Sequence, residues 1–325
     1  MAAANQTPIN SGFHAKSSAS DVLSGLDLSG KNAVVTGGYS GIGIEAVRAL
    51  AAAGARVTVP ARRVDAAETA LADVSGDIEI AAMDLGDIPS VMKFTHEYED
   101  SGRALDIVIN NAGIMACPEA RVGPGWESQF GINHLGHMAM SQGLMAAMQR
   151  AASPRLVALS STAHIRSDVH WDDPHFNTHP YDKWDAYGQA KSANALFALG
   201  LDNQHAETGI RAFSVHPGGI FTPLQRHLPD EEMVALGWKN ADGTTPPAIQ
   251  AMFKTPEQGA ATSVWAATSP KIADMGGVYC EDCDIAQMAT EDSQRWEHAR
   301  EWITNDEKAD RLWAMSEKML AGETA

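Results

Sequence analysis

The chain has 325 residues, of which 41 are acidic and 24 are basic, and its formal net charge at pH 7 is −17. This length suits one large domain and requires no second core. Nucleic acid is excluded as an expected partner, because binding phosphates needs a clustered basic face that the sequence lacks. No stretch reaches the ~18 apolar residues of a membrane helix, so we expect no membrane association and a cytoplasmic protein.

The two ends of the chain differ in pattern from its middle. Residues 1–26 are small and polar, lack the apolar core of a secretory signal, and predict a flexible or loosely attached arm. The main domain is expected over residues 27–289, followed by a helical extension over 290–325. The three cysteines, Cys117, Cys280 and Cys283, predict no disulfide framework, and the C-x-x-C spacing of the last two is interpreted as incidental.

The domain begins with a strand, a glycine turn and a helix. Ala33–Val35 is apolar, TGGYSGIG occupies positions 36–43, and Ile42–Ala53 has a helical pattern. Gly37, Gly41 and Gly43 let backbone N–H groups approach phosphates at the N-terminus of the helix, where the helix dipole favours negative charge. The segment therefore predicts a pyrophosphate site.

The same alternation of strands and helices continues along the chain. Further strands are expected at Ala55–Val59, Ile78–Ala82, Leu105–Ile109, Arg155–Leu159, Ile210–Val215 and Gly277–Tyr279. This pattern predicts an α/β fold, a Rossmann-type doubly wound parallel sheet in a single domain. Small or polar residues follow the strands, and a ligand is expected at that edge of the sheet.

Tyr187 and Lys191 lie in the run YGQAK. A spacing of four residues puts both side chains on one face of a helix, where the ammonium group would lower the pKa of the phenol. With Ser161 upstream and the glycine turn, the pair indicates acid–base chemistry at a site of hydride transfer.

Together these stretches resemble the short-chain dehydrogenase/reductase family over Leu28 to Cys283. The matching motifs, in the family's order, are Thr36-Gly37-x-x-x-Gly41-x-Gly43, Asp84-Leu85, Asn110-Asn111-Ala112-Gly113, Asn133, Ser161, Tyr187-x-x-x-Lys191 and Pro217-Gly218-x-x-x-Thr222. NHLGH, SSTAH and the long segment between serine and tyrosine look most like the retinol-dehydrogenase-like branch and its bacterial relatives. Many animal members of that branch carry a membrane anchor, and this chain departs from them.

The resemblance implies a catalytic role for four residues. Tyr187 would be the general acid or base, and Lys191 would lower its pKa and hold the nicotinamide ribose. Ser161 would polarise the substrate oxygen, and Asn133 would hold a water that relays protons from Lys191. The choice of Ser161 over Ser160 depends on the resemblance alone.

The resemblance also implies a set of residues that hold a dinucleotide. They are Thr36, Gly37, Tyr39, Ser40, Gly41, Ile42, Gly43, Arg62, Asp84, Leu85, Asn111, Ala112, Gly113, Tyr187, Lys191, Pro217, Gly218 and Thr222. At the end of the second strand, Ala61 is neutral and Arg62 follows it, which suits the 2′-phosphate of NADP because guanidinium binds phosphate bidentately. NADP is therefore expected, with NAD as the alternative.

Residues 162–186 form an insertion between Ser161 and Tyr187, which lie 26 positions apart. Its histidines and acids, His164, His170, His175, His179, Asp172 and Asp173, offer metal-binding side chains, but their spacing matches no zinc pattern and no metal is expected. We expect instead a loop that gives the substrate a partly aromatic wall.

Residues 223–255 are expected to form a substrate lid. Its apolar side chains, with Phe221 just before it, are Leu224, Leu228, Met233, Leu236, Trp238, Met252 and Phe253. They predict a small-molecule substrate, a bulky apolar or aromatic ketone or aldehyde, or the corresponding alcohol. Two alternatives stay open: a carbon–carbon double-bond reductase like the protochlorophyllide reductases, and a non-catalytic dinucleotide sensor.

The C-terminal segment Glu291–Leu320 has a helical pattern, with Trp296, Ala299, Trp302 and Ile303 on one face. The extension could cover the pocket or meet another subunit. In the family the helices near residues 127–149 and 187–205 often make dimers and tetramers, so a homodimer or homotetramer is possible from sequence.

Overall fold

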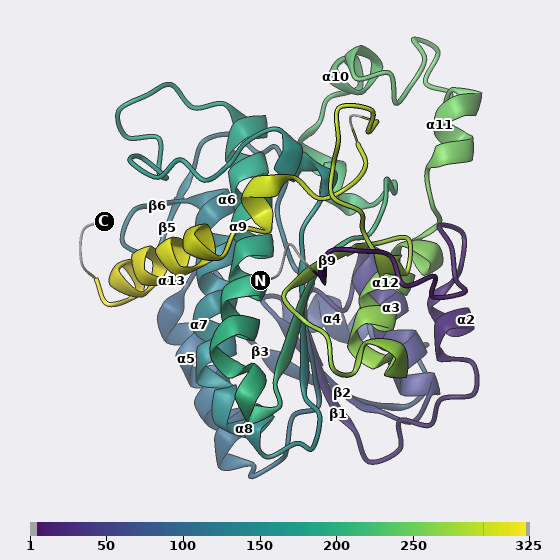
Figure 1. Ribbon diagram of the computed structural model, residues 1–325, viewed down its shortest axis with the longest axis vertical. Coiled ribbons are helices and arrows are strands. Elements are labelled where there is room, and N and C mark those ends of the chain that lie inside the picture. The colour runs from purple at the N-terminus through teal and green to yellow at the C-terminus, as the bar shows by residue number, and fades with distance from the viewer. Residues whose placement is uncertain (1–4, 295, 323–325) are drawn as a thin grey trace.

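The computed structural model describes residues 5–294 and 296–322, and a sheet with the strand order β10-β9-β8-β7-β4-β1-β2-β3 runs through its centre (Figure 1). All neighbouring strands of this sheet are parallel except β10, which pairs antiparallel with β9. The strands are β1 Asn32–Val35, β2 Arg56–Ala61, β3 Asp77–Ala82, β4 Ile107–Asn110, β7 Arg155–Leu159, β8 Arg211–His216, β9 Val278–Glu281 and β10 Asp284–Ile285. The expected doubly wound sheet is confirmed.

Helices cover both faces of the sheet (Figure 1). One face carries α2 Ala19–Leu23, α3 Gly41–Ala52, α4 Val64–Leu71 and α12 Pro256–Thr268; the other carries α5 Ile88–Asp100, α7 Gly136–Gly143, α8 Met145–Gln149 and α9 Lys183–His205. Successive residues of a strand point to opposite faces, so Val34 packs into one apolar core and Val35 into the other. Both faces are buried, which accounts for the continuous apolar runs of the strands.

The sheet order reverses beside β1, which lies between β2 and β4. The chain runs outward through β2 and β3, then crosses to β4 on the other side of β1. Loops leaving β1 and β4 therefore diverge at the carboxyl edge of the sheet, and in open α/β sheets this divergence is where ligands bind.

The helix expected near residues 127–149 is interrupted. A small hairpin of β5 Arg121–Val122 and β6 Trp126–Glu127 precedes α6 Ser128–Phe130, a π-helix η1 Gly131–Leu135, and then α7 and α8. In η1 the N–H of Gly136 bonds to the carbonyl of Gly131, five residues back. Such π segments are rare and are frequent at functional sites.

The expectation of a loosely attached N-terminal arm is wrong for residues 6–26, whereas residues 1–4 lie outside the described part. Gln6 is buried, and its side chain donates to the carbonyls of Tyr279 (2.6 Å) and Ala286 (2.7 Å) and accepts from the N–H of Tyr279 (2.9 Å). Helix α2 buries Val22 and Leu23 in a core that it shares with α3 and α12. The arm is polar because it makes hydrogen bonds to the last strands.

The helix expected over Glu291–Leu320 begins only at residue 306, as α13 Asp306–Leu320. Before it lie irregular chain and the short 3₁₀ helix η6 Glu301–Ile303, and Trp296 is 47% exposed. Helix α13 crosses α9 (Figure 1), where the rings of Trp313 and Phe197 stack with centroids 5.8 Å apart. The extension therefore packs on the domain through its last fifteen helical residues.

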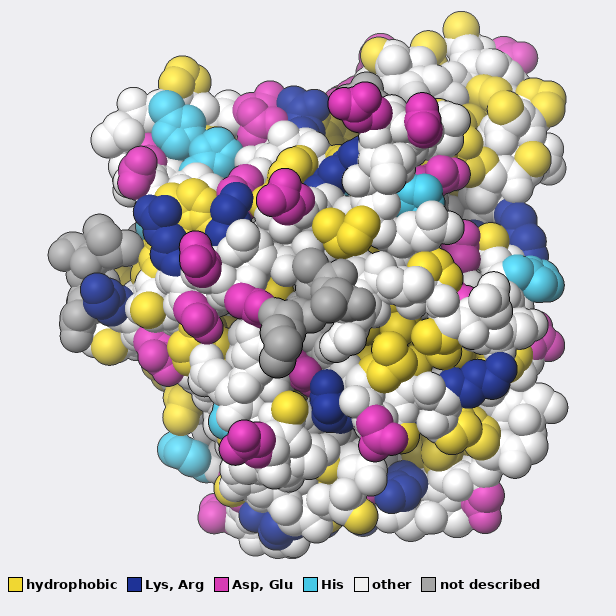
Figure 2. Space-filling model, viewed as in Figure 1, with side chains coloured by type: hydrophobic (Ala, Val, Ile, Leu, Met, Phe, Trp, Pro, Cys, Tyr) yellow, Lys and Arg dark blue, Asp and Glu magenta, His cyan; other side chains and the backbone are white. Residues whose placement is uncertain are grey.

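Residues 223–255, the expected lid, project from the body at the carboxyl edge of the sheet (Figure 1). This segment consists of η4 Pro223–His227, α10 Asp230–Ala235 and α11 Pro247–Met252, and Figure 2 shows hydrophobic side chains gathered on it. The remaining short 3₁₀ helices are η2 Thr162–Ile165, η3 Ala206–Thr208 and η5 Pro270–Ile272. None of the helices in the described ranges is both long enough and apolar enough to cross a membrane.

Candidate active site

A cavity of about 1600 Å³ lies at the carboxyl edge of the sheet. Most residues expected from sequence to bind or react line it: Thr36, Gly37, Tyr39, Ser40, Gly41, Ile42, Arg62, Asp84, Leu85, Asn111, Ala112, Gly113, Ser161, Tyr187, Lys191, Pro217, Gly218 and Thr222. Gly43 and Asn133 do not line it. The fold thus brings residues from six strand ends into one space.

The glycine turn presents its backbone to the cavity. Gly37 and Gly41 have φ angles of +63° and +57°, which side chains other than glycine rarely adopt. Ser40, the N-cap of α3, makes no capping hydrogen bond with its side chain. The first N–H groups of α3 therefore face the cavity without a side-chain cap, as an anion-binding helix terminus requires.

Thr36 ties this turn to the end of β4. Its hydroxyl accepts from the N–H groups of Asn111 and Ala112, both at 2.9 Å, and its carbonyl accepts from Nδ2 of Asn111 at 2.8 Å. Gly43 lies behind the turn, where a Cβ would be 2.3 Å from the carbonyl oxygen of Gly37. Glycine at this position is a packing requirement, because no larger residue leaves room for the turn.

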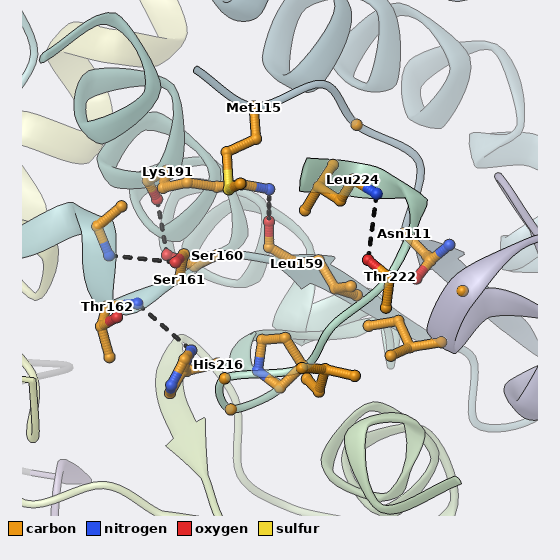
Figure 3. A pocket seen from close by; sticks show the side chains of 18 of the residues that line it. Asn111, Met115, Leu159, Ser160, Ser161, Thr162, Lys191, His216, Thr222 and Leu224 are labelled. Carbon is orange, nitrogen blue, oxygen red and sulfur yellow. Dashed lines mark hydrogen bonds between the residues drawn. The ribbon is translucent and has the colours of Figure 1, made fainter. Parts of the chain in front are cut away.

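The two serines after β7 have different partners (Figure 3). Ser160 is buried and donates its hydroxyl to the carbonyl of Lys191 at 2.8 Å. Ser161 caps η2, where its Oγ accepts from the N–H of Ala163 at 3.1 Å. Burial raises the pKa of Tyr187, and its contact with the side chain of Ser161 opposes that rise. Of the two hydroxyls, only that of Ser161 is engaged with Tyr187.

Tyr187 and Lys191 project from α9 and are each 5% exposed. The ammonium nitrogen of Lys191 lies 5.5 Å from the ring centroid of Tyr187 and donates to the carbonyl of Leu159 at 2.8 Å (Figure 3). Burial raises the pKa of Tyr187 to about 12, against the hydrogen bond with Ser161, and burial lowers the pKa of Lys191 to about 7.

These values differ from the expectation that Lys191 lowers the pKa of Tyr187. Removing the lysine from water disfavours its charged form, and a lysine with a pKa near 7 is only partly charged at neutral pH. The spacing in the sequence correctly puts both groups on one helix face. It carries no information about how deeply that face is buried.

Asn133 lies behind the cavity wall, in the π-helix η1. Its side chain forms two hydrogen bonds with the backbone of Ile114: Oδ1 accepts from the N–H at 2.9 Å, and Nδ2 donates to the carbonyl at 3.0 Å. A Cβ on Gly113 would lie 3.1 Å from Oδ1 of Asn133 and 3.9 Å from Nζ of Lys191. The side chain thus fixes the strand end beside Lys191 and does not face the open cavity.

Arg62 and Arg63 follow β2 at the rim of the cavity. Within the ranges that the structure describes, neither guanidinium group has a carboxylate partner in an ion pair. Ala61, which ends the strand, is buried and neutral. At the end of β2 the rim therefore offers the positive charge of Arg62 and Arg63, and Ala61 supplies no carboxylate to bond ribose hydroxyls.

The 162–186 insertion gives the cavity fewer aromatic side chains than expected. Thr162, Ala163, Ile165, Arg166 and Trp184 line the cavity, whereas Trp171 and Phe176 do not. The ring of His170 stacks on that of His179, with centroids 5.1 Å apart, and both contact Phe176. In the described part of the chain no three His, Cys, Asp or Glu side chains are grouped to hold a metal ion.

Only some of the apolar side chains expected from residues 223–255 line the cavity. Leu224, Leu236, Trp238, Met252 and Phe253 line the cavity. Leu228 and Met233 are buried instead in a small cluster that also contains Met115 and Tyr187. Phe221 is 37% exposed and lies outside the main cavity. Tyr187 is therefore surrounded by apolar groups from residues 223–255.

Several cavity residues carry no sequence signal. His216 at the end of β8 accepts from the N–H of Thr162 at 3.3 Å, and burial lowers its pKa to about 3 (Figure 3). Lys254 is buried against Gly218 and pairs with Asp282 at 2.6 Å. Lys16 comes from the N-terminal arm, and the C-terminal segment adds Trp296, Arg300 and Trp302. Only the folded chain brings these distant segments together.

Comparisons with known proteins agree with this geometry. The short chain dehydrogenase family model matches residues 31–233. A "probable oxidoreductase" of Streptomyces lividans is 44% identical over 293 residues, covering 89% of this chain and 97% of its own. Retinol dehydrogenase 12 of Mus musculus is 32% identical over 300 residues, covering 91% of this chain and 88% of its own.

Solved structures are similar over most of the chain. The crystal structure of an uncharacterised protein from Mycobacterium paratuberculosis has a TM-score of 0.70 and 28% identity, covering 92% of this chain and 97% of its own. The RhlG/NADP active-site complex of Pseudomonas aeruginosa has a TM-score of 0.61 and 25% identity, covering 78% and 95%. With the family model and the relatives, this likeness establishes that the chain belongs to the short-chain dehydrogenase/reductase family of oxidoreductases, in its retinol-dehydrogenase-like branch.

Proposed function

We propose that this enzyme uses NADP(H) to interconvert a bulky apolar or aromatic ketone or aldehyde and the corresponding alcohol. One observation carries the proposal: Ser161, Tyr187 and Lys191 line the same cavity as the glycine turn, and apolar residues surround that tyrosine. Acid–base groups and a phosphate-binding turn in one cavity are what hydride transfer to a carbonyl requires.

The fit of a dinucleotide rests on the glycine turn and the N-terminus of α3. Backbone N–H groups of Ser40 to Ile42 would hold the pyrophosphate, and Asn111 to Gly113 would lie along the ribose. When bound, NADPH supplies the hydride that the carbonyl carbon receives. The guanidinium groups of Arg62 and Arg63 pair with no carboxylate among the described residues, and this supports a 2′-phosphate and hence NADP over NAD.

The proton comes from the chain itself. Tyr187 donates its phenolic proton to the substrate oxygen as the carbon accepts the hydride, so that the carbonyl becomes an alcohol. Ser161 donates a hydrogen bond to the same oxygen and stabilises the negative charge that develops there. In the reverse direction Tyr187 would remove the hydroxyl proton, and the same contacts would serve.

Lys191 assists when a dinucleotide is bound. An anionic ligand nearby favours the charged form of a buried lysine, which raises its pKa from about 7. The resulting ammonium group, close to the ring of Tyr187, would stabilise the tyrosinate that proton transfer leaves behind. Cofactor binding would in this way activate the acid.

The substrate class follows from the volume and lining of the cavity. About 1600 Å³ leaves room for a large molecule besides a dinucleotide. Met115, Trp184, Leu224 and Trp238 lie on the side of Tyr187 and present apolar or aromatic surface. A bulky apolar carbonyl compound would bury the most surface there.

The test follows oxidation of NADPH and of NADH, in parallel assays, by the loss of their absorbance. The substrates are a panel of bulky ketones, aldehydes and enones. We expect carbonyl turnover to be faster with NADPH. We also expect it to be roughly 10²–10⁴-fold slower in Tyr187→Phe, since that variant lacks the proton donor. Tyr98→Phe is the matched control, because Tyr98 lies in α5 away from the cavity.

Other outcomes of this assay would favour one of the alternative functions or refute the role of Tyr187. Turnover of enones alone would indicate a double-bond reductase. Tight cofactor binding without turnover of any compound in either direction would indicate a dinucleotide sensor. Activity of Tyr187→Phe equal to that of the unaltered chain would refute the assigned acid.

A further inference from the structure

His137 is a buried histidine that the proposed reaction does not use. It is the second histidine of NHLGH, lies at the start of α7, and is 2% exposed. Both of its ring nitrogens have partners in the expected site: Nδ1 lies 2.9 Å from the carbonyl oxygen of Asn133, and Nε2 lies 2.8 Å from Oγ1 of Thr36. The ring therefore joins two elements that carry functional residues.

The partners determine which nitrogen carries the hydrogen. The carbonyl oxygen of Asn133 can only accept, so Nδ1 of His137 must donate. Burial lowers the pKa of His137 to about 4, so the ring is neutral at neutral pH and Nε2 is an acceptor. The hydroxyl of Thr36 then donates to Nε2.

The orientation of the Thr36 hydroxyl follows. With its hydrogen directed at His137, its lone pairs accept from the N–H groups of Asn111 and Ala112, both at 2.9 Å. The alternative acceptor for this hydroxyl, the carbonyl of Ile109, is farther away at 3.4 Å. Every donor and acceptor in the chain of bonds is matched, which is the condition for a buried polar network to add rigidity.

We infer that His137 is a positioning residue: it fixes the carbonyl of Asn133 through Nδ1 and the hydroxyl of Thr36 through Nε2. The inference rests on the proposed function, because the proton-relay role expected for Asn133 and the cofactor-binding role expected for Thr36 both belong to that hydride-transfer reaction. Through the two bonds the π-helix η1 and the backbone beside the dinucleotide keep one relative position.

The two ring nitrogens can be tested separately. The amide of His137→Asn reaches about as far as Nδ1, so this variant keeps the bond to Asn133 and loses the one to Thr36. The longer amide of His137→Gln reaches the place of Nε2, so it keeps Thr36 and loses Asn133. We would measure the NADPH dissociation constant by quenching of tryptophan fluorescence, and kcat at saturating NADPH. His96→Asn and His96→Gln, on the exposed side of α5, are matched controls.

The expected result is a split between binding and turnover. His137→Asn should raise the NADPH dissociation constant about tenfold and keep kcat within about twofold, and His137→Gln should do the reverse, the size being that of one buried hydrogen bond. Equal losses of both quantities in the two variants, or no loss in either, would overturn the inference, since a merely structural role does not distinguish the nitrogens.

A further variant keeps the inference testable if a His137 variant fails to fold. Thr36→Val removes the hydroxyl without changing the shape of the side chain, and it should weaken NADPH binding at least tenfold. A change of less than twofold would overturn the inference. The binding measurements need no substrate, so they stand even if the proposed carbonyl chemistry is refuted.

Discussion

Replacing Lys191 with methionine should stabilise the fold below neutral pH while removing the proposed activity. The lysine is buried, and its ammonium group donates to the carbonyl of Leu159. Burial lowers its pKa from 10.5 to about 7. Below pH 7 the folded protein must hold a charge that the unfolded chain keeps in water, and this costs on the order of 5 kcal/mol.

The pH dependence has a definite sign. Between pH 7 and about 10 the unfolded chain binds more protons at this position than the folded chain, so folding stability from Lys191 rises with pH. The cost is complete below the folded pKa of about 7 and disappears above the ordinary value of 10.5. Methionine removes the cost and also the hydrogen bond to Leu159, worth about 1 kcal/mol. The net gain expected at pH 6 is therefore about 4 kcal/mol, shrinking towards pH 10.

The measurement is urea unfolding of the unaltered chain and Lys191→Met at pH 6, 8 and 9.5. Lys93→Met is the matched control, because the side chain of Lys93 is 68% exposed and its pair with Glu97 lies on the surface. The control should change the free energy of unfolding by less than about 1 kcal/mol at every pH. A gain in Lys191→Met that does not vary with pH, or a loss at pH 6, would refute the reasoning.

Three further predictions concern the cofactor site and the arm. Arg62→Asp should weaken NADPH binding roughly ten- to a hundredfold and leave NADH binding nearly unchanged, because it replaces a phosphate partner with a repelling charge; equal effects on both cofactors in a titration would contradict this. Gly43→Ala puts a Cβ 2.3 Å from the carbonyl oxygen of Gly37, so NADPH affinity should fall at least tenfold and thermal unfolding should occur at a lower temperature. Unchanged values would show that the turn can open without loss. Gln6→Ala removes three buried hydrogen bonds to the last strands and should cost about 3 kcal/mol in denaturant unfolding; a loss below about 1 kcal/mol would mean that the arm is attached mainly by other contacts.

The strands and most of the cavity lining could be predicted from the sequence. Buried parallel strands leave continuous apolar runs, and the residues that follow them share one edge of the sheet, so spacing alone brings Asn111, Ser161 and Pro217 together. The proximity of Tyr187 and Lys191 was also predictable, since the period of a helix puts residues four apart on one face.

The errors occur where contacts join distant parts of the chain. Gln6 bonds to Tyr279, which is 273 residues away, and no local pattern in a polar arm reports such a partner. The sequence predicts Trp296 and Trp302 on one face of a long helix, but Trp296 lies in irregular chain, Trp302 lies in the short 3₁₀ helix η6, and both line the cavity. Asn133 lies in the π-helix η1 and bonds to the backbone of Ile114, and the sequence of η1 differs little from that of a regular helix.

Helix α13 also determines what can approach the outer side of α9. Trp313 stacks on Phe197, the ring of Trp313 would meet a Cβ on Gly200 at 3.4 Å, and Ser316 bonds to His134 at 2.7 Å. A second copy of the chain would reach this strip of α9 only if α13 moved away. Shortening the chain at its C-terminus would therefore expose apolar side chains of α9 and favour self-association.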